Sequence, residues 1–130
     1  MKFVIDTNVI VSGVLRPASK PGRILDLMLA RESSYVVSTE LVEEYREVLK
    51  HPKFGFDAAS VDSLVDGLAA GAELVVPYPQ RDVISNNPKD QFVIDLACAA
   101  NAYITTGNAK HFVGYERTVS PAEALDLLRN

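Results

Sequence analysis

The chain has 130 residues and a mass of 14.2 kDa, the size of a single domain. Hydrophobic residues make up 48% and charged residues 23%, which excludes a disordered chain, and the single cysteine, Cys98, excludes an intrachain disulfide. The net charge of −4 argues against binding nucleic acid through a strongly basic surface, although a bound divalent cation would still attract phosphate. The apolar runs fall short of a membrane span, and Asp6 interrupts any signal-like stretch, so we expect a soluble cytoplasmic protein.

Segments typical of strands alternate with segments typical of helices, which predicts one α/β domain over residues 1–130 with a mainly parallel sheet. Strands are expected at 2–5, 35–37, 73–76 and 103–105, with a fifth at 118–119 left open. The pattern predicts a loop over 12–21, helices over 22–31, 39–50, 57–70 and 88–101, and a turn with a short helix over 107–113. Expected caps are Ser38 or Thr39, Asp57, and a Ser120–Glu123 capping box before a C-terminal helix.

Three polar side chains stand where a parallel sheet would place a ligand site. Asp6 directly follows the first predicted strand, Asn108 comes just after the fourth, and Asp90 lies in the first turn of the helix over 88–101. Ligands bind outside the carboxyl ends of the strands in open α/β sheets. The three residues therefore converge if the first and fourth strands are neighbours, which at this point is an assumption.

The helix over 39–50 supplies a possible fourth member from its glutamates, Glu40, Glu43, Glu44 and Glu47. At roughly 100° per residue, Glu44 falls on the border of the apolar arc, whereas Glu43 and Glu47 fall on the opposite side. We therefore expect Glu44 to point along the domain and the other three to be solvated.

Each candidate also has a purely structural interpretation. Asp6 suits a helix cap or turn, Asp90 suits the dipole of a helix N-terminus, and Asn108 after a glycine suits a turn. Their combination is more informative, because clustered carboxylates with little positive charge nearby repel one another and need a cation. Ligands that offer only oxygen favour Mg²⁺ or Mn²⁺.

Four segments, in order and with matching spacing over residues 2–113, resemble the motifs of PIN-domain ribonucleases. The segments are FVIDTNVIV at 3–11, ELVEEYREVL at 40–49 followed by HPKF at 51–54, NPKDQF at 87–92, and AYITTGN at 102–108. The second segment resembles the branch formed by toxin components of toxin–antitoxin systems. The resemblance implies a three-layer α/β/α sandwich around a parallel sheet of four or five strands. It also implies an acidic site that binds Mg²⁺ or Mn²⁺ and cleaves single-stranded RNA, in which Asp6, Glu44 and Asp90 match the family's acids.

The chain departs from the family pattern in its third and fourth motifs. The fourth motif normally ends in Asp, where this chain has Asn108, which keeps an oxygen ligand but loses a charge. Asn87 stands where Asp is common. The family often carries an acid at Asp95, which would partly compensate as a metal ligand. Because Asp95 lies about 140° around the helix from Asp90, the two need not share a face.

The resulting hypothesis is metal-assisted hydrolysis of a phosphodiester. Asp6, Glu44 and Asp90 would hold the ion directly or through water, with Asn108 and Asp95 as further ligands. Thr7 and Asn8 would orient a ligand or tie down the turn. Candidate RNA contacts, which could equally be solvated, are Arg16, Lys20, Arg23, Lys110 and His111. The sequence offers His111 no identifiable acid or base partner.

Two alternatives stay open. With Asn108 in place of Asp, the domain could be a weakly active or inactive scaffold that binds RNA or a partner protein. A phosphatase of the haloacid-dehalogenase type also begins with a strand ending in Asp, but that chemistry needs a second Asp where this chain has Asn8. The resemblance implies a small antitoxin as a partner, and homodimers are common in the family. The helices over 22–29 and 57–70 are compatible with a dimer face.

Overall fold

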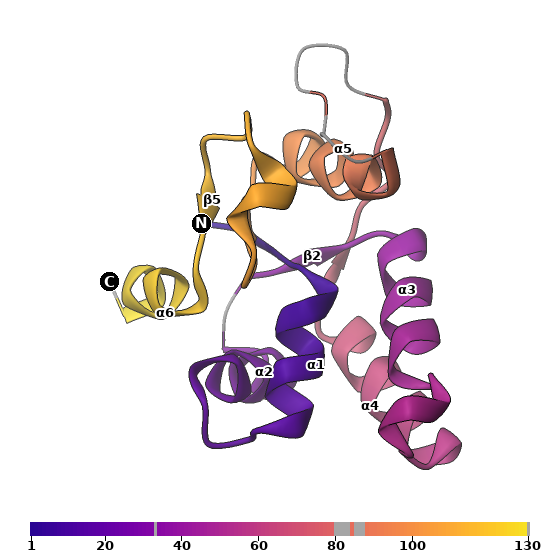
Figure 1. Cartoon of the computed structure of the whole chain (residues 1–130). Coiled ribbons are helices and arrows are strands. Elements are labelled where there is room, and N and C mark those ends of the chain that lie inside the picture. Colours follow the sequence, from indigo (N-terminus) through magenta and orange to yellow (C-terminus); the bar gives the residue numbers. More distant parts are fainter. Residues whose placement is uncertain (33, 80–83, 85–87, 130) are drawn as a thin grey trace.

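The computed structural model describes residues 1–32, 34–79, 84 and 88–129 (Figure 1). The elements are β1 (Phe3–Ile5), α1 (Thr7–Leu15), α2 (Lys20–Ala30), β2 (Val36–Val37), α3 (Thr39–Leu49), η1 (Pro52–Phe54), α4 (Ala58–Ala70), β3 (Glu73–Leu74), η2 (Pro88–Asp90), α5 (Gln91–Ala100), β4 (Tyr103–Thr105), η3 (Ala109–Phe112), β5 (Thr118–Val119) and α6 (Pro121–Arg129).

The strands are parallel, and β4 lies between β1 and β5. Phe3 is opposite Tyr103 in the first ladder, and Ile104 is opposite Thr118 in the second. This confirms the assumed adjacency of the first and fourth strands, and β5 is the strand left open at 118–119. The largest sheet in the described part of the chain has three strands rather than the predicted four or five. The strands β2 and β3, each two residues long, pair with each other. An isolated bridge between Phe3 and Tyr35, the residue before β2, connects this pair to β1.

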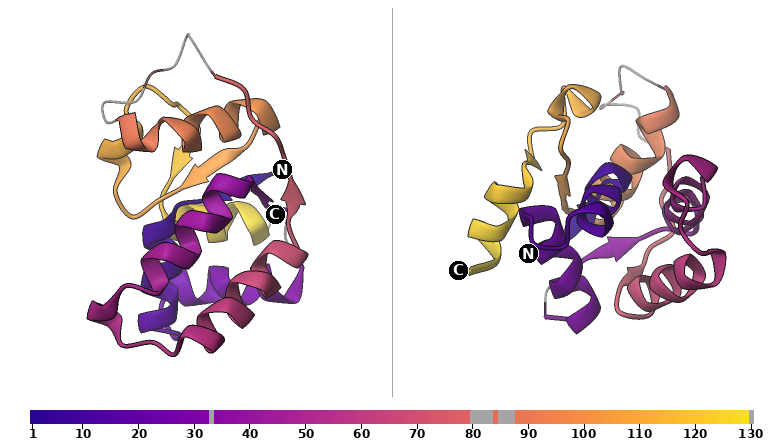
Figure 2. Two further views of the ribbon diagram at one scale, coloured as in Figure 1. Left: turned by 90° about the vertical axis from the view of Figure 1, so that its right-hand side faces the viewer. Right: turned by 60° about the horizontal axis from the view of Figure 1, so that its bottom comes forward.

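Helices flank the sheet on both sides, as the predicted α/β/α architecture requires. Helix α5 packs against β1 and β4, whereas α1, α2 and α4 gather on the other side of the strands (Figures 1 and 2). The three residues of β1 are buried, as expected for a strand covered on both faces. Within the described residues, no helix combines the length and the apolar character that a membrane crossing requires.

The predicted loop over 12–21 is wrong. Helix α1 runs from Thr7 to Leu15, and α2 already begins at Lys20. The β-branched residues at 9–11 concealed a helix whose buried face includes Val9, Ile10 and Gly13. A Cβ at Gly13 would lie 2.9 Å from the carbonyl oxygen of Pro21, so this glycine permits close packing of two segments rather than marking a loop.

The expected helix starts are confirmed by their hydrogen bonds. The hydroxyl of Ser38, not that of Thr39, caps α3, and the Asp57 carboxylate accepts from the N–H of Ser60 at the start of α4. Ser120 and Glu123 form a reciprocal capping box before α6. The helix predicted over 88–101 is divided into η2 and α5, which places Asp90 at their junction.

Candidate functional site

Asp6 stands at the point where β1 ends and α1 begins. Its backbone has the extended conformation of an N-cap, but its carboxylate makes no capping hydrogen bond to α1. Instead, Asp6 Oδ2 accepts a hydrogen bond of 2.7 Å from Thr106 Oγ1, and the residue is only 8% exposed. The carboxylate is therefore held in place by the neighbouring strand end, and the helix-cap interpretation does not describe it.

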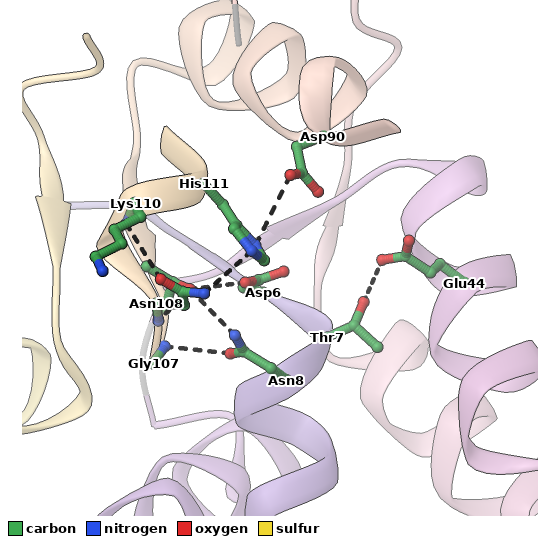
Figure 3. Close-up of polar contacts among 10 residues, drawn as sticks. Asp6, Thr7, Asn8, Glu44, Asp90, Gly107, Asn108, Lys110 and His111 are labelled. Carbon is green, nitrogen blue, oxygen red and sulfur yellow. Dashed lines mark hydrogen bonds and ion pairs between the residues drawn. The ribbon is translucent and has the colours of Figure 1, made fainter. Parts of the chain in front are cut away.

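Thr106 organises this edge of the sheet. Besides donating to Asp6, its buried hydroxyl accepts from Asn8 Nδ2 at 3.4 Å and from the N–H of Asn108 at 3.1 Å. Asn8 Oδ1 accepts in turn from the N–H of Gly107 at 3.2 Å (Figure 3). No pattern in the sequence pointed to Thr106. Its contact with Asp6 depends on the pairing of β1 with β4, because the register that pairs Ile5 with Thr105 sets the next two residues side by side.

Glu44 comes from the middle of α3 and is half-buried, whereas Glu40, Glu43 and Glu47 are exposed, as the helical geometry predicted. Its carboxylate accepts a hydrogen bond from the hydroxyl of Thr7, the first residue of α1 (Figure 3). Thr7 therefore supports a site carboxylate directly.

Asp90 lies at the end of η2, on the α5 side of the site (Figure 3). Its Oδ2 atom is buried and accepts no hydrogen bond from the described residues. The group facing it is the imidazole of His111, whose Nδ1 is 3.7 Å from Oδ2. A buried carboxylate oxygen without a hydrogen bond is costly unless another group neutralises it.

Asp6, Glu44 and Asp90, here called the acidic cluster, affect one another electrostatically although they come from three different elements. Burial raises the pKa of Asp6, and the charge of Asp90 raises it further, whereas the Thr106 hydroxyl and the backbone N–H of Thr7 oppose the rise. Burial likewise raises the pKa of Glu44 against the hydrogen bond from Thr7, and the charges of Asp6 and Asp90 add to the rise. Asp6 and Glu44 thus lie in an environment that disfavours their negative charge.

His111 does have polar partners, contrary to the expectation from the sequence. Besides facing Asp90, its Nε2 lies 3.1 Å from Asn108 Nδ2. Asn108 Oδ1 accepts from the N–H of Lys110 at 3.3 Å, so the side chain of Asn108 spans the turn that opens η3. The sequence could not reveal the contact with Asp90, because it joins residues of two separate elements.

The other predicted site residues lie apart from the acidic cluster or turn away from it. Asp95 accepts from Gln91 Nε2 at 2.9 Å, so its described hydrogen bond stays on its own helix, and its role as a ligand stays a prediction. Figure 3 shows the Lys110 side chain extending away from the carboxylates. Arg16 follows the last turn of α1, a helix of nine residues and therefore roughly 14 Å long, and Lys20 and Arg23 lie in the first turn of α2. Asn87 lies outside the described residues.

A divalent cation bound at the acidic cluster would have to keep part of its water shell. Among residues 1–32, 34–79, 84 and 88–129, no three His, Cys, Asp or Glu side chains stand close enough together to hold one ion. Mg²⁺ commonly binds through one or two carboxylates and retains several waters. Asp6 and Asp90 suit direct ligation, since one is desolvated and the other has an unsatisfied oxygen, and Glu44 suits contact through water.

The structure is a parallel α/β/α fold in which three carboxylates, from the end of β1, from α3 and from η2, lie at one edge of the sheet (Figure 3). The family model described as PIN domain matches residues 2–110, and the chain belongs to the PIN-domain family. PIN domains are generally nucleases and typically use divalent metal ions. The chain is also similar to an uncharacterized protein, MJ1680, of Methanocaldococcus jannaschii. The two are 28% identical over 111 residues, which cover 83% of this chain and 71% of that protein.

Proposed function

We propose that the chain is a Mg²⁺- or Mn²⁺-dependent endoribonuclease that hydrolyses phosphodiester bonds of single-stranded RNA. The observation that carries the proposal is the acidic cluster itself. Asp6, Glu44 and Asp90 lie around one part of the site (Figure 3), burial raises the pKa of Asp6 and of Glu44, and the charge of Asp90 adds to both rises. A divalent cation would remove this penalty and at the same time supply the charge that attracts a phosphate.

The surroundings of the three carboxylates suit them to different roles, two to metal binding and one to general-base catalysis. Thr106 holds Asp6 in one orientation, and Asp90 presents a buried oxygen without a hydrogen bond, so these two would hold the ion. Glu44 is held by Thr7, and its raised pKa brings it closer to that of an effective general base for the attacking water. When bound, the ion would lower the pKa of that water and stabilise the developing charge on the phosphate.

The positions of the basic side chains fit a small RNA footprint. His111 lies within the site and Lys110 lies beside it on η3, so these two are our candidates for phosphate contacts near the scissile bond. Arg16 follows the last turn of α1, and Lys20 and Arg23 lie in the first turn of α2, where they would contact only a longer RNA. The acidic net charge of −4 agrees with a substrate held mainly through the ion.

For the biological role, we propose the toxin component of a cytoplasmic toxin–antitoxin pair. The support is the likeness of residues 40–54 to the second motif of that branch, together with an acidic cluster that a basic side chain of a small antitoxin would neutralise. A homodimer through α2 and α4 stays part of the proposal. Leu29 of α2 is 42% exposed, which is consistent with such a face.

A second candidate function, a scaffold that binds RNA or a protein without cleaving it, has specific support. Asn108 replaces the usual acid and caps η3 with its side-chain oxygen. In addition, the described residues contain no ready-made group of three metal ligands. Both observations favour weak metal binding.

Cleavage of a pool of fluorescent single-stranded RNAs separates the two functions. We expect products with Mn²⁺ or Mg²⁺ and none with EDTA, and Asp6→Asn or Asp90→Asn should reduce the rate at least about 100-fold, since even outer partners of metal ligands are worth 10–100-fold. Asp62→Asn is the matched control, because Asp62 is an aspartate of α4 outside the acidic cluster. RNA binding without cleavage at any metal concentration would favour the scaffold and overturn the nuclease.

A further inference from the structure

The hydrogen bonds of Asn108 determine which nitrogen of His111 carries the proton. Asn108 Oδ1 accepts from the N–H of Lys110 at 3.3 Å, which turns its amide nitrogen toward His111 Nε2, 3.1 Å away. An amide nitrogen can only donate, so Nε2 must be the unprotonated, accepting nitrogen. A neutral imidazole carries one proton, which therefore resides on Nδ1.

The protonated nitrogen is the one that faces the acidic cluster. Nδ1 of His111 lies 3.7 Å from Asp90 Oδ2, the buried oxygen that accepts no hydrogen bond from the described residues (Figure 3). An N–H directed at this oxygen supplies the favourable dipole that the buried carboxylate otherwise lacks. It would also limit the orientations that the Asp90 carboxylate adopts.

We infer that Asn108 is a positioning residue, which fixes His111 as the Nδ1–H tautomer so that the imidazole orients Asp90. The inference rests on the proposed function only in treating Asp90 as a member of the nuclease site. It gives the Asn at this position a task that an Asp could not perform. A carboxylate would accept a hydrogen bond rather than donate one, and it would draw the imidazole proton to Nε2, away from Asp90.

The chain contains its own reference for this inference. His51, which precedes η1, has the opposite arrangement, because its Nδ1 accepts from the N–H of Lys53 at 3.2 Å. The proton of neutral His51 must therefore be on Nε2. The structure assigns opposite tautomers to the two histidines of the chain.

Long-range ¹H–¹⁵N correlation spectra of the metal-free full chain, recorded at alkaline pH where both rings are neutral, test the assignment. We expect Nδ1–H for His111 and Nε2–H for His51. In Asn108→Asp, His111 should change to Nε2–H, because the new carboxylate accepts from that nitrogen, and in Asn108→Ala it should become a mixture of both tautomers. His51 should stay as it is in both variants. Asn108→Asp keeps an oxygen acceptor for the N–H of Lys110, so it preserves the start of η3 if the alanine variant fails to fold. An Nε2–H signal for His111 in the wild type, or Nδ1–H retained in both variants, would overturn the inference.

Mn²⁺ binding measured by titration calorimetry provides a second readout. If Asn108 acts through His111, Asn108→Ala and His111→Ala should each weaken binding about tenfold, as outer partners of metal ligands do, and the double variant no further. Losses that add in the double variant would give Asn108 an independent role and contradict the inference. The NMR experiment uses neither RNA nor metal, so its outcome stands apart from that of the nuclease assay.

Discussion

Helix α3 contributes to two carboxylate-rich regions that differ in their source of positive charge. Glu44 faces the acidic cluster. Arg46 and Lys50, on the α4 side of the helix, meet two aspartates of α4. Arg46 Nη1 lies 2.6 Å from Asp62 Oδ1, Arg46 Nη2 lies 2.9 Å from Asp66 Oδ1, and Lys50 Nζ lies 2.8 Å from Asp62 Oδ1. We call these four residues the ion-pair cluster.

The two clusters shift carboxyl pKa values in opposite directions. Hydrogen bonds from Lys50 and Arg46 lower the pKa of Asp62, whereas burial raises the pKa of Asp6 and of Glu44. Carboxylates that already pair with arginine or lysine side chains do not need a bound metal ion to neutralise them. A group of acidic residues is therefore a candidate cation site when it is buried and has few cationic side chains nearby, and the number of acids alone does not decide this.

The largest contrast is expected in cleavage activity along a single helix. Glu44→Gln should reduce Mn²⁺-dependent cleavage about 10- to 100-fold, because it removes the proposed base and outer partner of the ion. Glu47→Gln, which changes an exposed glutamate on the same helix, should stay within about twofold of the wild type. Initial rates on one RNA substrate measure both variants. Equal losses would mean that Glu44 acts only through the general charge of α3.

The second-largest contrast is expected in how much Mn²⁺ raises the thermal stability of the protein. At 100 times the dissociation constant, a ligand of the native state adds about 2.7 kcal/mol to the free energy of unfolding. We expect thermal melts of the wild type and of Asp62→Asn to rise with Mn²⁺, and those of Asp6→Asn to lose the increase. A metal response that disappears in Asp62→Asn instead would assign the cation to the ion-pair cluster.

In the metal-free protein, Asp6 and Asp62 should make the free energy of unfolding change with pH in opposite directions. The pKa of Asp6 is raised, so the folded chain binds more protons than the unfolded chain at pH values above the ordinary pKa of 3.8. Its contribution therefore lowers the free energy of unfolding as pH rises through that window. The pKa of Asp62 is lowered, so its contribution is present above the ordinary value and is lost as the pH falls.

Denaturant titrations across this pH range measure the two contributions. Asp6→Asn should remove the decrease in the free energy of unfolding that accompanies rising pH and should stabilise the metal-free protein near neutrality. Asp62→Asn should remove the loss on acidification. A wild-type slope retained in Asp6→Asn would contradict the raised pKa of this carboxyl.

The smallest effect should come from breaking the ion-pair cluster itself. Lys50 and Asp62 form a partly exposed pair, with side chains 36% and 42% accessible, and exposed pairs contribute little because solvent screens them. Lys50→Met should therefore lower the melting temperature by only about 2 °C or less. Calorimetry measures this change, and a far larger drop would show that the cluster anchors α3 to α4.

Much of the site followed from sequence because its rules are local. Asp6 was predicted from its position after a strand, Asp90 from its position in the first turn of a helix, and Glu44 from its position around the helix relative to the other glutamates. Their convergence needed one further fact, the adjacency of β1 and β4, which the register supplies.

The rest depended on contacts that no local rule contains. Thr106 reaches Asp6 across a separation of 100 residues, and His111 meets Asp90 from another element. Helix α1 was missed because its β-branched residues favour a strand in isolation, whereas packing against α2 favours the helix. The sheet was overestimated because β2 and β3 are short and contact β1 at one bridge.

Anomalous diffraction from crystals soaked in Mn²⁺ compares the two clusters most directly. We predict a manganese peak beside the carboxylates of Asp6 and Asp90, with Glu44 reached through water, and no peak at the ion-paired aspartates of α4. A peak confined to Asp62 and Asp66, or an acidic cluster that stays without manganese at saturating concentration, would contradict the account.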